Sequence, residues 1–125
     1  MRKYLLTSIF VLIPILLFAD NYYGKRIGID NGLSQASVTC ITYNDDGALW
    51  IGTRFGLNEY SNEKIINFTK EKYGLSGCCI NGLFCSPKDN TLWVSSERGL
   101  HTFDSNKGVF HSISSEPTNC VLEHN

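Results

Sequence analysis

The sequence has no excess of charge of either sign and no long apolar run after its first 19 residues. Its 11 Lys and Arg against 12 Asp and Glu leave a formal net charge of -1, and residues 20–125 hold 9 basic and 12 acidic side chains. This near-neutrality argues against binding of nucleic acid or another polyanion. With 42% hydrophobic and 12% aromatic residues, the 125-residue chain can bury a core. This composition argues against intrinsic disorder, and the length allows one domain at most.

The first 19 residues differ from the rest. Arg2 and Lys3 precede an apolar run from Tyr4 to Ala19, which stops at Asp20. A membrane-spanning helix needs about 20 apolar residues, so the pattern predicts a signal peptide with cleavage after Ala19. Signal peptidase prefers a small residue where this chain has Leu17, so an uncleaved anchor helix is the alternative. In both cases we expect the remainder to lie outside the cytoplasm.

The cysteines form no disulfide framework, because their number after the leader is odd. Cys78 and Cys79 are adjacent and cannot easily share one metal ion, and the three histidines are far from them in the sequence. We therefore expect no metal site and no cofactor. We interpret the cysteines as small buried apolar side chains on strands, with one adventitious disulfide as the alternative. They are Cys40, Cys78, Cys79, Cys85 and Cys120.

The sequence also lacks a recognisable active site. Gly74-Leu75-Ser76-Gly77 misses a spacer residue of the nucleophile elbow of hydrolases. The acidic residues Asp45, Asp46 and Asp89 fall in turn segments, where Asp is expected for its hydrogen bonds to the backbone. We predict no catalytic residue, and we expect that this chain is not an enzyme.

The sequence contains an internal repeat of 42–43 residues. The one extra residue of the second copy fits in a turn, where an insertion costs little. The matching segments are Gly32-Leu33-Ser34 with Gly74-Leu75-Ser76, Leu49-Trp50-Ile51 with Leu92-Trp93-Val94, Gly56-Leu57 with Gly99-Leu100, and Tyr60 with Phe103.

Each copy alternates four short apolar runs with turn signals, and no stretch after residue 20 keeps helical periodicity. This pattern is typical of an antiparallel meander, and four such strands make a propeller blade. The predicted strands are Val38–Tyr43, Ala48–Gly52, Leu57–Tyr60 and Ile65–Phe68 in the first copy, and Ile80–Cys85, Leu92–Ser95, Leu100–Phe103 and Val109–Ile113 in the second.

The first copy resembles the two-component regulator propeller repeat, through Gly32-Leu33-Ser34, Val38-x-x-Ile41 and the segment from Asp46 to Tyr60. The second copy has Ser95-Ser96 in place of Gly52-Thr53 but is otherwise similar. Residues at equivalent positions of the two copies are interpreted as structural, with the tryptophans packing between blades. They are Trp50, Gly52, Gly56, Leu57, Tyr60, Trp93, Gly99, Leu100 and Phe103.

The expected fold is all-β: a partial β-propeller of about two and a half four-stranded blades, preceded by the signal or anchor helix. Closed propellers typically need about 4 to 8 blades, so the chain is expected to be a fragment whose partners are the remaining blades of a longer protein. The expected segments are a leader at 1–19, a lone strand within 20–31, blades at 32–73 and 74–115, and the start of a third blade at 116–125.

The resemblance implies the periplasmic ligand-sensing part of a bacterial hybrid two-component sensor. It implies carbohydrate-derived ligands, signalling to a histidine kinase that this chain does not contain, and a homodimer of the full-length protein. Contact with the membrane is expected only through the leader or a missing C-terminal part. The alternative is a secreted propeller lectin or enzyme, a lyase or hydrolase, because fold does not dictate function.

Positions that differ between the copies are the candidates for ligand binding. Arg54-Phe55 in the first copy corresponds to Glu97-Arg98 in the second, on the turn between the second and third strands. Arg offers a planar fork of donors, and Phe55 offers a stacking surface for a ligand. The alternative is that all four are ordinary solvated turn residues.

Overall fold

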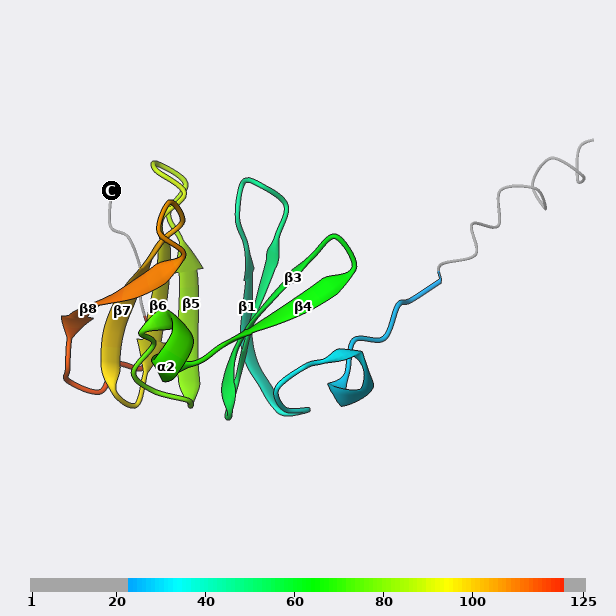
Figure 1. Cartoon of the computed structure of the whole chain (residues 1–125), viewed down its shortest axis with the longest axis horizontal. Coiled ribbons are helices and arrows are strands. Elements are labelled where there is room, and N and C mark those ends of the chain that lie inside the picture. Colours follow the sequence, from blue (N-terminus) through cyan, green and yellow to red (C-terminus); the bar gives the residue numbers. More distant parts are fainter. Residues whose placement is uncertain (1–22, 121–125) are drawn as a thin grey trace, which may run out of the picture.

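The computed structural model describes residues 23–120, which form two four-stranded antiparallel sheets (Figure 1). We call the sheet of β1–β4 blade 1 and the sheet of β5–β8 blade 2. In both, each strand pairs with the next one in the chain, so both are simple meanders. The strands are β1 (Val38–Tyr43), β2 (Leu49–Thr53), β3 (Gly56–Ser61), β4 (Lys64–Phe68), β5 (Ile80–Cys85), β6 (Leu92–Ser96), β7 (Gly99–Asp104) and β8 (Val109–Ser114).

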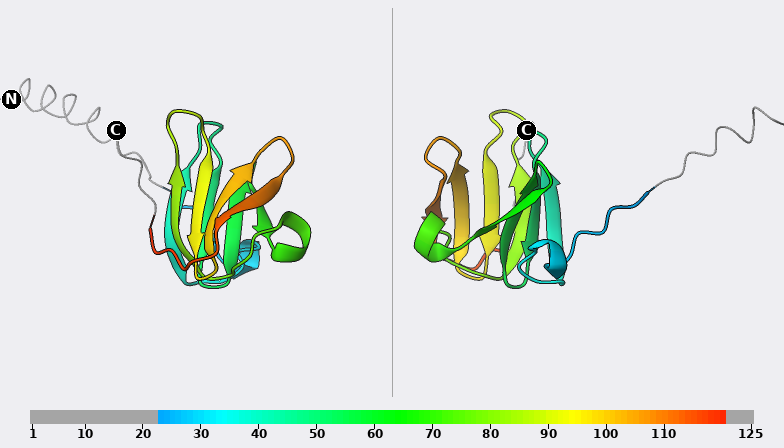
Figure 2. Two further views of the ribbon diagram at one scale, coloured as in Figure 1. Left: turned by 90° about the vertical axis from the view of Figure 1, so that its left-hand side faces the viewer. Right: turned by 45° about the vertical axis from the view of Figure 1, so that its right-hand side comes forward.

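The blades stand face to face, with their first strands β1 and β5 side by side and their outer strands fanning apart (Figures 1 and 2). This is the arrangement of two consecutive propeller blades, and it confirms the predicted all-β partial propeller. All eight predicted strands are present, and no bound differs from the prediction by more than one residue.

The two blades share a local irregularity that follows the repeat. In blade 1 the register shifts between Val38 and Cys40, and in blade 2 it shifts between Ile80 and Gly82. Such a bulge inserts one extra residue and bends the strand. The extra residue of blade 1, Thr39, uses its hydroxyl to donate a 2.6 Å hydrogen bond to the carbonyl of Ile80. The bulge therefore ties the first strands of the two blades together.

The core lies between the blades. Because side chains alternate across a strand, the residues that pair with one another share a face. Blade 1 buries Trp50, Leu57 and Phe68 on what we call its back face, and blade 2 meets them with its front face. The ring centroids of Trp50 and Phe103, one from each blade, lie 5.2 Å apart. The front face of blade 2 contributes Ile80, Leu83, Leu92, Val94, Phe103 and Phe110, with Leu75 from the link between the blades.

The two repeated tryptophans have different surroundings. Trp50 is 2% exposed between the blades. Trp93 occupies the same position on the back face of blade 2 and is only half buried, because no further blade lies against it within residues 23–120.

The strand expected within residues 20–31 is not found in the described part of that range. Residues 23–28 have no regular structure, and Ile29–Asn31 form the 3-10 helix η1. A strand needs a neighbouring strand as partner for its backbone hydrogen bonds, whereas this segment forms hydrogen bonds within itself. The Gly28 carbonyl accepts from the backbone N–H of Asn31, and the Gly28 N–H donates to the Asn31 side chain, both at 3.0 Å.

The predicted leader, residues 1–19, lies outside the described residues. The same holds for residues 121–125, the last part of the segment expected to begin a third blade. Residues 116–120 form no strand. Within residues 23–120, no helix has the length and hydropathy to span a bilayer.

A one-turn helix, α2 (Lys70–Tyr73), interrupts the strands where no helical periodicity was expected. It follows Thr69 and ends at Gly74, whose φ of 80° suits a residue without a side chain. The interpretation of the cysteines as buried strand residues holds only in part. Cys40 and Cys85 lie on strands and are half buried, with Cys40 packed against the core, whereas Cys78, Cys79 and Cys120 lie outside the strands; all five are free. Cys78 and Cys79 precede β5, in a loop whose backbone amides bind a carboxylate and which therefore stays at the surface.

We expect Gly52→Ala to destabilise the chain, because the blades approach too closely at this point for a side chain. A Cβ atom at Gly52 would lie 2.6 Å from Sγ of Cys40 and 2.7 Å from Cγ2 of Ile80. The expected loss of unfolding free energy in urea is about 1–3 kcal/mol. Gly28→Ala is the control, because no atom lies within 4 Å of its added Cβ. Equal stability of the two variants would contradict the close packing.

Candidate functional site

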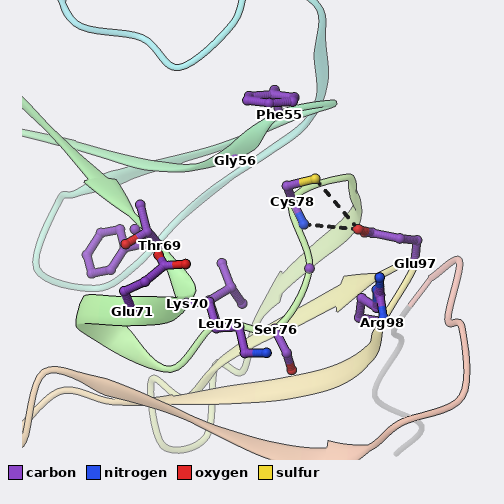
Figure 3. Close-up of a pocket in the computed structure, with 12 residues that line it drawn as sticks. Phe55, Gly56, Thr69, Lys70, Glu71, Leu75, Ser76, Cys78, Glu97 and Arg98 are labelled. Carbon is purple, nitrogen blue, oxygen red and sulfur yellow. Dashed lines mark hydrogen bonds between the residues drawn. The ribbon is translucent and has the colours of Figure 1, made fainter.

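A cavity of about 500 Å³ opens at the junction of the two blades (Figure 3). Its walls come from three segments that are distant in the sequence: the β2–β3 turn, the link between the blades, and the β6–β7 turn. Its volume is typical of small-ligand sites. The lining residues are Phe55, Gly56, Phe68, Thr69, Lys70, Glu71, Leu75, Ser76, Gly77, Cys78, Glu97 and Arg98.

The two turns that line the cavity are built in the same way. In blade 1 the Thr53 hydroxyl accepts a hydrogen bond from the backbone N–H of Phe55 at 3.1 Å and donates to the carbonyl of Gly56 at 2.9 Å. In blade 2 the hydroxyl of Ser96 makes the same pair of bonds, to Arg98 and Gly99. A buried hydroxyl thus fixes each turn and presents the next side chains, Phe55 and Arg98, at the cavity.

Glu97 holds the loop before β5, which contains Cys78 and Cys79, at the side of the cavity opposite Phe55. Its carboxylate accepts hydrogen bonds from the backbone N–H groups of Cys78, at 3.1 Å, and Cys79, at 2.9 Å. The Cys78 thiol also donates to it, at 3.7 Å (Figure 3). Hydrogen bonds to an ionised group are stronger than neutral ones, so this residue holds the loop before β5 in place.

His101 contacts the link between the blades from the buried side, at Ser76. Its Nε2 lies 2.7 Å from the hydroxyl of Ser76, and its side chain is fully buried. The equivalent residue of blade 1 is Asn58, which makes the corresponding bonds to Ser34 at 2.9 Å. Asn58 also donates to the carbonyl of Ile51 at 3.0 Å, whereas His101 Nδ1 has no hydrogen-bond partner within the described part of the chain. Burial lowers the pKa of His101, because it disfavours the charged imidazolium.

The cavity has free positive charges at its edge. The Arg98 guanidinium and the Lys70 ammonium form no hydrogen bond or ion pair within residues 23–120. Glu97, by contrast, is engaged by the loop that it holds. Phe55 is 68% exposed and presents its ring to the opening. The arrangement can therefore bind a polar ligand that hydrogen-bonds to Arg98 and stacks on Phe55.

Three of the four residues suggested as ligand contacts, Phe55, Glu97 and Arg98, line this one cavity. The fourth, Arg54, belongs to the same turn as Phe55 but is not among the lining residues. Whether any of them binds a ligand stays a prediction. The sequence reasoning missed the contribution of the link, namely Lys70, Glu71 and Ser76. The predicted ranges assign Lys70 and Glu71 to the end of the first blade and Ser76 to the start of the second, and only the match of Ser76 with Ser34 hinted at a shared role.

The described residues hold no cluster of three or more His, Cys, Asp or Glu side chains that could bind a metal ion.

Comparison with known families matches residues 32–55 to the two component regulator propeller. The chain carries a two-component regulator propeller repeat. The matched stretch of this repeat runs from Gly32 through β1 and β2 to Phe55 at the cavity. No curated protein matches the chain.

Solved structures extend the likeness over both blades. The chain is similar to the extracellular domain of the putative hybrid two component system BT3049 from B. thetaiotaomicron, with 29% identity over 70% of this chain and a TM-score of 0.65. It is also similar to the extracellular domain of the putative hybrid two component system BT4673 from B. thetaiotaomicron, with 28% identity over 62% of this chain and a TM-score of 0.58. The chain covers only 13% and 10% of those two chains.

We expect the stability of the chain to fall as the pH falls below about 6.5, the ordinary pKa of histidine. Because the folded chain lowers the pKa of His101, the unfolded chain binds more protons in the window below that value, and stability rises with pH there. The contribution is at most about 1.4 kcal/mol per pH unit. His101→Asn, which restores the residue of blade 1, should flatten the dependence between pH 5 and 7 in urea unfolding. An unchanged slope of the unfolding free energy against pH in this variant would contradict the assignment of the effect to His101.

Proposed function

We propose that this chain is part of the ligand-sensing propeller of an exported hybrid two-component sensor. The observation that carries the proposal is the likeness of both blades to the extracellular domains of such systems, at 29% identity over 70% of the chain in one case. The location follows from the same likeness, since those domains are extracellular, and from the predicted leader. We place the chain in the periplasm, as the input side of the sensor and not as an enzyme.

We assign ligand binding to the cavity between the blades. Sugar-derived ligands are bound in proteins by aromatic faces together with planar donors and acceptors, and the opening offers Phe55, Arg98 and the hydroxyl of Ser76. The proposed ligand is a carbohydrate-derived molecule the size of a small oligosaccharide, which fits a volume of about 500 Å³.

A ligand in this position would touch both blades and the link between them. It would therefore favour one relative placement of the blades over another, and a shift of that equilibrium is what a sensor transmits. The remaining blades, the second subunit of a homodimer and the histidine kinase that receives the signal are supplied by partners outside this chain. Signalling thus depends on the complete sensor, whereas ligand binding can be measured on the chain.

We expect Arg98→Ala to weaken oligosaccharide binding by about tenfold, because one hydrogen bond to a charged donor is lost. The measurement is isothermal titration of the chain with neutral gluco-oligosaccharides and with uronate-containing oligosaccharides. Phe55→Ala should weaken the same ligand through loss of stacking. Arg54→Ala, run in the same series, tests the fourth residue suggested by the sequence.

The matched control is Lys107→Ala, which also removes one positive charge from an exposed turn of blade 2 but lies outside the cavity lining. It should bind as the unchanged chain does. If neither Arg98→Ala nor Phe55→Ala changes the affinity for the oligosaccharide, the cavity is not its binding site. An absence of binding to either class of oligosaccharide would contradict the carbohydrate ligand.

A further inference from the structure

Two adjacent cysteines lie at the cavity, in the loop before β5. Cys78 is exposed and lines the cavity, and Cys79 is half buried. Both backbone N–H groups donate to the Glu97 carboxylate, at 3.1 and 2.9 Å, and Figure 3 shows the Cys78 thiol directed at the same group. In return, the Glu97 N–H donates to the carbonyl of Cys79 at 3.3 Å. The three residues therefore form one hydrogen-bonded unit, which we call the dithiol unit.

The side chains of the dithiol unit are not needed for the fold of a blade. The equivalent residues of blade 1 are Ala36, Ser37 and Arg54, which have neither thiols nor a carboxylate. The backbone hydrogen bond is nevertheless kept, because the Arg54 N–H donates to the carbonyl of Ser37, also at 3.3 Å. The thiols and the carboxylate are thus additions to blade 2 at the cavity, which indicates a role other than folding.

The two cysteines on strands are less reactive than a free thiol. Burial raises the pKa of Cys40 and of Cys85, and nearby aspartates raise that of Cys85 further. A raised pKa lowers the fraction of thiolate, which is the reactive form. Cys120 is exposed, as Cys78 is. Only Cys78 and Cys79 are neighbours in the chain, so a reaction between their thiols is favoured by proximity.

A disulfide between adjacent residues closes a ring that contains their peptide bond. In the dithiol unit this bond carries the Cys79 N–H, which donates to Glu97. The Cα atoms of adjacent residues lie about 3.8 Å apart, closer than the usual range of about 4.4–6.8 Å across a disulfide. The ring therefore closes only if the backbone of the loop moves. A strained and exposed disulfide of this kind is easily reduced again, so it acts as a reversible switch and not as a structural crosslink.

We propose that Cys78 and Cys79 are a thiol-oxidation site, at which a reversible disulfide releases Glu97 from the loop and thereby changes the cavity. The oxidant is a disulfide compound, as found in extracytoplasmic compartments. One thiolate attacks the oxidant and forms a mixed disulfide, which the second thiolate then attacks. The S–S bond of the oxidant breaks as the new one forms. The oxidant thus takes up two electrons and the two thiol protons and leaves as two thiols.

Closure of the ring acts on the cavity through Glu97. It removes the thiol hydrogen that Cys78 donates to Glu97 and the one that Cys79 donates to the Asn81 side chain at 3.8 Å, and it turns the Cys79 N–H away. The released carboxylate can pair with the guanidinium of Arg98, its neighbour on the turn. Arg98 is then withdrawn from the ligand, a consequence that rests on the proposed function of the cavity.

Treatment of the chain with oxidised glutathione tests the ring. The remaining thiols are alkylated, and the chain is cleaved after Phe84, which separates the pair from Cys85. Mass spectrometry should find Cys78 and Cys79 unalkylated and their peptide lighter by two hydrogen atoms, and dithiothreitol should restore both thiols. Two free thiols, glutathione bound to either residue, or a bond from either to another cysteine would overturn the proposal.

Cys120→Ser is the matched control, because it removes one exposed thiol outside the pair. The ring should form in this variant as it does in the unchanged chain. In Cys79→Ser the ring cannot form, and the peptide that holds Cys78 should keep the mass of the reduced form after dithiothreitol-free oxidation and alkylation. Loss of the ring in Cys120→Ser would show that Cys78 and Cys79 are not each other's partners.

Glu97→Gln tests the connection between the ring and the carboxylate. The charged carboxylate stabilises the reduced loop, in which both N–H groups donate to it, so its replacement should favour the oxidised form. The equilibrium constant for oxidation should rise about tenfold, which lowers the midpoint potential by about 30 mV. Glu71→Gln makes the same change at another carboxylate of the lining and should leave the potential unaltered. An unaltered potential in Glu97→Gln would show that the ring does not act on Glu97.

Titration of the reduced and the oxidised chain with the same oligosaccharides separates this proposal from the proposed function. The oxidised chain should bind about tenfold more weakly, because the charged donor of Arg98 is withdrawn. Equal affinity of the two forms would contradict the effect of the ring on the cavity. An absence of binding to both forms would contradict the carbohydrate ligand, whereas the ring and its potential are measured without any ligand.

Discussion

The structure depends on the packing of one sheet face against another between the two blades. Neither meander can shield its apolar side alone, and Trp50, Leu57 and Phe68 become buried only because blade 2 lies against them. The aromatic rings of Phe68, Phe103 and Phe110 meet edge-on or tilted at this interface, with centroids 4.8–5.6 Å apart. This contact sets the distance between the end of β4 and the start of β5, and hence the path that the link must take.

The cavity is a consequence of that path. The link leaves β4, turns once as α2, and returns beneath the β6–β7 turn, where Leu75 is buried and Ser76 and Glu97 make their hydrogen bonds. Polar groups of the link and of both turns are thereby gathered at the margin of an apolar interface. A site in this position depends on how the blades are placed, which is the property that a sensing role requires.

Much of this could be predicted from the sequence, because the relevant signals are local and repeated. Alternation of apolar residues and the turn at Asp46-Gly47 predicted the strands, and a comparison of the two copies singled out Phe55, Glu97 and Arg98, which line one cavity. The link could not be derived in the same way. Its helix is a single turn, too short for a periodic pattern, and Lys70 and Glu71 enter the cavity only through the folding of residues far apart in the sequence.

By itself, the sequence determined the meander of each blade, since strand periodicity and turn chemistry act over a few residues. Only the tertiary structure decided which of two equivalent residues is buried. Trp50 and Trp93 have similar local sequences, yet Trp50 is fully buried and Trp93 is only half buried. The physical reason is that burial is set by the neighbouring blade, about 43 residues away in the chain, and no local pattern records whether that neighbour is present.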